Sequence, residues 1–66
     1  MKIRVNGKEY QFDTSLNVSQ LLQKLNIKGQ WIVVELNTNI VDKQKYDETT
    51  LSDGDTVEIV GFVGGG

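Results

Sequence analysis

Apolar and polar residues alternate at the start of the chain with the two-residue period of a half-buried β-strand. Residues 2–5 read KIRV and residues 9–13 read EYQFD, so that every second position in each run is apolar or aromatic. The dipeptide Asn6-Gly7 lies between the two runs, and it favours a tight turn in which both residues have positive φ. The pattern therefore predicts an N-terminal β-hairpin.

The period then changes from two residues to that of an amphipathic helix. Asn17 suits the N-cap position, and Gln20 lies three residues later, as in a capping box. Asn26 tolerates the left-handed conformation that ends many helices, and Ile27 can close over the last turn. The pattern predicts a helix over residues 18–25, with one apolar stripe at spacings of three, four and seven residues: Val18, Leu21, Leu22 and Leu25.

The second half of the chain returns to strand-like segments. Residues 31–36, WIVVEL, are apolar at both alternating sets, which predicts an inner strand covered on both faces, with Trp31 at the edge of the core. Residues 37–39 are predicted as a turn, and residues 40–41 as a short partner strand. A polar crossing loop follows. After a turn-forming cluster that contains Asp53-Gly54, residues 56–60 are predicted as the last strand.

This order of elements indicates an α+β domain. One helix with a single apolar face has to pack on one face of a mixed sheet, here of four to five strands. If the first and last strands pair in parallel at the centre of that sheet, the arrangement is the ubiquitin-like β-grasp. We expect a β-grasp domain over residues 1–62, followed by a flexible glycine tail over residues 63–66.

Composition narrows the possible functions. The 66 residues suffice for one domain, and 38% of them are hydrophobic, as in folded globular proteins. The chain has no cysteine and no histidine, so the usual nucleophile–base pairs and transition-metal ligands are missing. The formal net charge of −2 argues against nucleic-acid binding. The missing histidine and cysteine make the chain a poor candidate for an enzyme, and we expect a protein that is not itself an enzyme. The sequence has neither a membrane-length apolar run nor a signal-peptide pattern, so the expected location is the cytoplasm.

The sequence ends on three glycines, Gly64, Gly65 and Gly66. Glycine has no Cβ, so such a segment can enter a narrow cleft that any side chain would block. Residues 63–66 reach at most about 14 Å beyond the domain, at roughly 3.5 Å per residue. A terminal carboxylate on Gly66 is a poor electrophile and would need activation, most simply as an acyl-adenylate made by a partner. The alternative is a linker or an inert tail.

The chain resembles the thiamine sulfur-carrier (ThiS) family along almost its whole length. The resemblance rests on KIRVNGKEY, NVSQLLQKL, IVVELNTNIV and, most specifically, LSDGDTVEIVGFVGGG. It implies that a ThiF-type adenylyltransferase uses ATP and magnesium to adenylate Gly66. It further implies that a sulfur donor such as a cysteine desulfurase converts Gly66 to a thiocarboxylate, which gives its sulfur to the ThiG thiazole synthase. Gly65 matches the penultimate glycine of the family, with Gly64 just before it.

Two other interpretations stay open at this stage. The small subunit of molybdopterin synthase also ends in Gly-Gly and carries sulfur in the same way, although that family is usually longer. The chain could also be a β-grasp interaction module whose tail is inert. In either carrier branch no cofactor is expected to be bound to the chain itself. For docking to a partner, strand alternation predicts that Val60 and Phe62 are exposed, with Val33 beside them.

Overall fold

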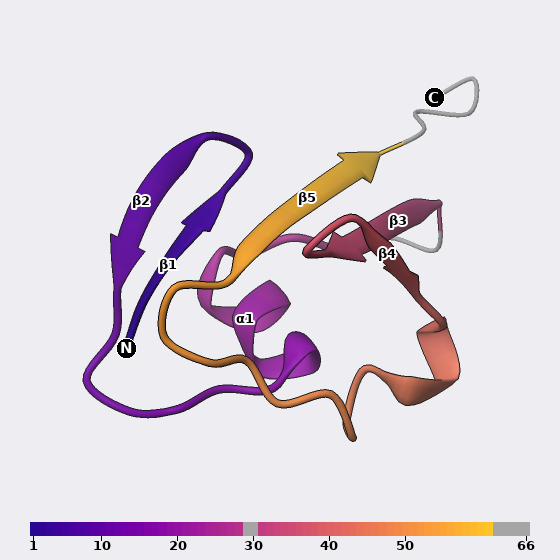
Figure 1. The fold of residues 1–66 in the computed structure, drawn as a ribbon. Coiled ribbons are helices and arrows are strands. Elements are labelled where there is room, and N and C mark those ends of the chain that lie inside the picture. Colours follow the sequence, from indigo (N-terminus) through magenta and orange to yellow (C-terminus); the bar gives the residue numbers. More distant parts are fainter. Residues whose placement is uncertain (29–30, 62–66) are drawn as a thin grey trace.

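The computed structural model describes residues 1–28 and 31–61. It contains one α-helix, a short 3-10 helix and one five-stranded sheet (Figure 1). In chain order the elements are β1 (Lys2–Val5), β2 (Lys8–Gln11), α1 (Val18–Lys24), β3 (Ile32–Leu36), β4 (Asn39–Val41), η1 (Lys43–Lys45) and β5 (Thr56–Gly61). In the part of the chain that the structure describes, no helix is long and apolar enough to cross a membrane.

The sheet has the strand order β2-β1-β5-β3-β4. The first and last strands, β1 and β5, pair in parallel at its centre, with Val5 opposite Val57. The other neighbouring pairs are antiparallel. This confirms the predicted α+β class and the ubiquitin-like β-grasp arrangement, including the central parallel pair.

Two tight turns of the same shape build the two hairpins of the sheet. Between β1 and β2, Asn6 has a φ of 50° and Gly7 a φ of 81°, as a type I′ turn requires. Between β3 and β4, Asn37 has a φ of 50° and Thr38 a φ of 75°. The second turn is one residue shorter than predicted, because Asn39 already pairs with Leu36 as the first residue of β4.

Helix α1 has the caps that the sequence predicts. The Asn17 side chain accepts a hydrogen bond of 2.8 Å from the Gln20 amide, and the Gln20 side chain accepts one of 2.9 Å from the Asn17 amide. At the other end Asn26 has a φ of 57°, and the Ile27 amide donates to the Leu22 carbonyl at 2.9 Å. Together these bonds satisfy backbone groups that a helix leaves unpaired at its ends.

The core lies between α1 and one face of the sheet. In β1 the alternation is strict, because Ile3 and Val5 are buried whereas Lys2 and Arg4 are exposed. The same face of β5 buries Val57 completely. No polar or charged residue is buried in the described part of the chain. The buried apolar residues are Ile3, Val5, Leu16, Val18, Leu21, Leu22, Val34, Tyr46, Leu51 and Val57.

Two sequence-based predictions about the β3 region were wrong. Trp31 does not lie at the edge of the core, because 68% of its surface is exposed. Strand β3 does lie inside the sheet, between β5 and β4, but it is not covered on both faces: Val33 and Glu35 are only half-buried. The physical reason is that a single short helix covers one face of a five-stranded sheet, and no helix among residues 1–28 and 31–61 covers the opposite face, here called the outer face (Figure 1).

Candidate functional site

The C-terminal half of β5 carries Val60, one of the three residues that the sequence predicted for partner docking. Successive side chains of a strand point to opposite faces, so the burial of Val57 towards α1 places Glu58 and Val60 on the outer face. Val60 is 45% exposed, and its direct cross-strand partner is Val33 of β3. The predicted juxtaposition of Val33 and Val60 is therefore present, whereas their docking role stays a prediction.

A third apolar side chain joins these two on the same face. Ile40 of β4 pairs with Glu35, which is two residues from Val33 on the same side of β3, and Ile40 is 69% exposed. Sequence reasoning missed Ile40, although the two-residue turn before it would have placed it on this face. We call Val33, Ile40 and Val60 the outer patch. Exposed apolar residues that gather on one face are typical of a protein-binding surface.

Two carboxylates border the outer patch. Glu35 of β3 and Glu58 of β5 are direct cross-strand partners on the outer face, half-buried and exposed respectively. Like charges placed directly opposite one another across two strands destabilise the pair. The acidic pair gives the surface next to Val33 and Val60 a negative charge, so a protein that covers the outer patch meets apolar groups and carboxylates together.

The remaining predicted site residues are Phe62, Gly64, Gly65 and Gly66, and they lie outside the described residues. The predicted tail over residues 63–66 does so as well. What the structure places is the strand that leads to them. Gly61, the last residue of β5, pairs with Ile32, and the sheet therefore holds β5 up to the point where the glycine segment follows.

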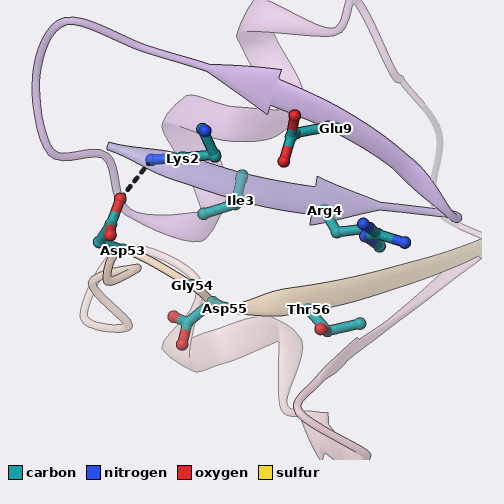
Figure 2. A pocket seen from close by; sticks show the side chains of 8 residues that line it. All are labelled: Lys2, Ile3, Arg4, Glu9, Asp53, Gly54, Asp55 and Thr56. Carbon is teal, nitrogen blue, oxygen red and sulfur yellow. Dashed lines mark hydrogen bonds between the residues drawn. The ribbon is translucent and has the colours of Figure 1, made fainter.

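A shallow depression of about 200 Å³ lies at the opposite end of β5, where that strand begins (Figure 2). Its charged side chains have both signs, and the Lys2 amide donates a hydrogen bond of 2.7 Å to Asp53 at its rim. The lining residues are Lys2, Ile3, Arg4, Glu9, Asp53, Gly54, Asp55 and Thr56. Across residues 1–28 and 31–61, no group of three or more acidic, histidine or cysteine residues could hold a metal ion. The depression at this end of the sheet is therefore a weaker candidate for the functional site than the outer patch.

Comparison with known proteins gives one consistent family. The model of the ThiS family matches residues 3–66. The chain is 38% identical to the sulfur carrier protein ThiS of Bacillus subtilis, over 97% of this chain and 98% of that one. It is also 42% identical to a thiazole synthase of Paramagnetospirillum magneticum, of which it spans only 20% of the length.

A solved structure agrees in fold as well as in sequence. The crystal structure of the thiamine biosynthesis protein ThiS from Geobacter metallireducens superimposes with a TM-score of 0.86 at 42% identity, and each chain is covered completely. Because the family model spans nearly the whole sequence and the Bacillus relative has nearly the same length, the chain described here belongs to the ThiS family.

Proposed function

We propose that this chain is a sulfur carrier for thiamine biosynthesis, which is loaded and unloaded at the carboxylate of Gly66. The observation that carries the proposal is the match along almost the full length to a protein named as a sulfur carrier. A segment like this chain also forms part of a protein named thiazole synthase, which supports a ThiG-type thiazole synthase as the recipient of the sulfur. The matches to the ThiS family model and to the ThiS structure from Geobacter metallireducens favour the thiamine branch over the molybdopterin branch.

The chemistry proceeds in three steps on partner enzymes. A carboxylate oxygen of Gly66 attacks the α-phosphorus of ATP on a ThiF-type adenylyltransferase, with magnesium bound to the nucleotide, and pyrophosphate leaves. A persulfide from a donor such as a cysteine desulfurase then attacks the Gly66 carbonyl carbon, and AMP leaves. A second thiol finally attacks the donor sulfur of the resulting acyl disulfide, which releases the Gly66 thiocarboxylate and leaves a disulfide between the donor and that thiol. This route needs no cofactor bound to the carrier.

The folded body supplies recognition in this proposal. The outer patch docks on the partner, with Phe62 as a further contact predicted from the sequence, and β5 leads from the patch towards the three glycines. Because glycine has no side chain, the segment that follows can enter a narrow active site while the body stays outside. The cytoplasm, where these partners would be met, remains the predicted location.

Intact mass spectrometry tests the carrier function directly. The chain is incubated with a ThiF-type adenylyltransferase, ATP, magnesium and a persulfide donor with its thiol reductant. We expect a gain equal to the replacement of one oxygen by sulfur, and no gain in a variant that lacks Gly65 and Gly66. An unchanged mass with an adenylyltransferase that is active on another carrier would contradict the proposal. If the chain replaced the small subunit of a molybdopterin synthase but gave no sulfur to a thiazole synthase, it would belong to the other branch.

A matched pair of variants tests the docking surface. Val60→Asp and Thr56→Asp each add one carboxylate to the outer face of β5, the first inside the outer patch and the second at the far end of the strand. Because a buried unpaired charge is costly, we expect Val60→Asp to raise the KM for adenylation by roughly tenfold or more. Thr56→Asp should leave that KM within about twofold, since surface substitutions have small effects. Equal KM values for the two variants would exclude the outer patch as the docking surface.

A further inference from the structure

Strand β5 is supported unequally by its two neighbours. On one side β3 pairs with it from Val57, opposite Leu36, to Gly61, opposite Ile32. On the other side β1 pairs only with Thr56 and Val57, because β1 ends at Val5 and the chain then turns away into β2. Residues 58–61 of β5, which lead to the glycines, therefore have no paired residue of β1 beside them.

The side chain of Asn6 takes the place of that missing backbone. The Asn6 amide donates to the Val57 carbonyl at 2.9 Å, which continues the parallel ladder by one bond. Beyond it, the Asn6 Oδ1 atom accepts a hydrogen bond of 2.8 Å from the Ile59 amide, and Nδ2 donates one of 3.2 Å to the Ile59 carbonyl. A carboxamide has one acceptor and one donor group, as a peptide unit does, so it can satisfy both backbone groups of Ile59.

The turn geometry explains why this residue reaches β5. Asn6 has a left-handed backbone with a φ of 50° and is the first residue of the type I′ turn. Asparagine accepts this conformation more readily than most residues with a side chain. The hydrogen bonds to Val57 and Ile59 show that these alternate residues direct their backbone groups to the β1 side. In the described part of β5, Ile59 is the last residue that has a hydrogen-bond partner on that side.

We propose that Asn6 is a positioning residue for sulfur loading. It holds the β1 side of β5 at Ile59, next to Val60 of the outer patch, while β3 holds the other side up to Gly61, and the two together fix the part of the strand from which the chain continues to Gly66. The inference rests on the proposed function. Its physical basis is proximity: in the docked complex, a fixed base for the tail keeps the reacting carboxylate near the active site for more of the time than a loosely held base does, even where binding is unchanged. Loss of Asn6 should then lower kcat for adenylation more than it raises KM.

Asn37 provides a matched control within the same chain. It has the same φ of 50° at the first position of the other hairpin turn. Its side chain also makes two hydrogen bonds to the β5 region, accepting one of 2.9 Å from the Thr56 amide and donating one of 3.0 Å to the Asp55 carboxylate. These bonds are at the start of β5, at the opposite end from Gly61.

The test compares Asn6→Gly with Asn37→Gly, since glycine adopts positive φ without strain and each change removes two side-chain hydrogen bonds. The full chain is used as the substrate of a ThiF-type adenylyltransferase, and pyrophosphate release gives kcat and KM. We expect Asn6→Gly to lower kcat by roughly tenfold with KM within about twofold, because the base of the tail and not docking is disturbed. Asn37→Gly should leave both constants within about twofold. Hydrogen exchange at the Ile59 amide should accelerate in Asn6→Gly alone.

Each other result counts against a defined part of the proposal. If both variants lower kcat to the same extent, the effect is general destabilisation and Asn6 does not position the glycine segment. If Asn6→Gly leaves kcat unchanged while the original chain is adenylated normally, only this inference is overturned. If the original chain is not adenylated at all, the proposed function fails and the inference fails with it.

Discussion

The two hairpin turns have the same shape but different residues at their second position, which predicts a stabilising substitution. Gly7 has a φ of 81° in the first turn, and Thr38 has a φ of 75° in the second. Positive φ is unstrained for glycine, whereas a β-branched residue rarely adopts it. In the left-handed region the Cβ of an L-residue approaches the following carbonyl oxygen, which costs about 1–2 kcal/mol. We therefore expect Thr38→Gly to stabilise the fold.

The size of the effect follows from two opposing contributions. Removal of the Cβ relieves about 1–2 kcal/mol of strain, while the greater freedom of glycine in the unfolded chain takes back roughly 0.5–1 kcal/mol. Thr38 is exposed, so the change removes no core packing. The net gain should lie between about 0 and 1.5 kcal/mol, and for a domain of this size the midpoint of about 0.75 kcal/mol corresponds to a rise in Tm of roughly 3–6 °C.

Thermal and urea unfolding followed by far-UV circular dichroism measure this gain. Fluorescence is a poor probe here, because Trp31 is already 68% exposed in the folded state. The reverse change, Gly7→Thr, is the control and should destabilise the fold by at least about 1 kcal/mol through the same strain. If Thr38→Gly lowered the Tm, or if the two variants shifted it in the same direction, left-handed strain at Thr38 would not be the governing term.

Three further predictions concern the body of the protein. Asn17→Ala should cost about 1 kcal/mol in urea unfolding, because it removes the N-cap bond to the Gln20 amide and a second bond to the Asp47 carbonyl. Leu21→Ala, at a fully buried position, should cost about 2–5 kcal/mol and leave much of the protein unfolded by circular dichroism. Burial raises the pKa of Tyr46 above its ordinary value of 10.0, so the unfolded chain loses that proton first and stability should fall as the pH rises above 10.0. Tyr46→Phe should lack this part of the fall when unfolding is measured across that range.

Much of the local structure could be predicted from residues that lie close together in the sequence. The alternation around Asn6-Gly7 indicated the first hairpin, and the spacing of Asn17 and Gln20 indicated the start of α1 within one residue. Alternation along the last strand predicted that Val60 would be exposed. These features depend on backbone geometry over a few residues, and the sequence alone therefore determined them.

Other features were decided only by packing between distant parts of the chain. Periodicity could suggest but not establish that β1 pairs in parallel with β5, and it did not predict that Ile40 would join the outer patch or that Trp31 would be exposed. The bond between Asn6 and Ile59 joins residues 53 positions apart. No local pattern specifies such contacts, because they depend on which face of the sheet a single helix can cover and on where each neighbouring strand ends. The tertiary structure therefore decided which residues surround the strand that leads to the glycines.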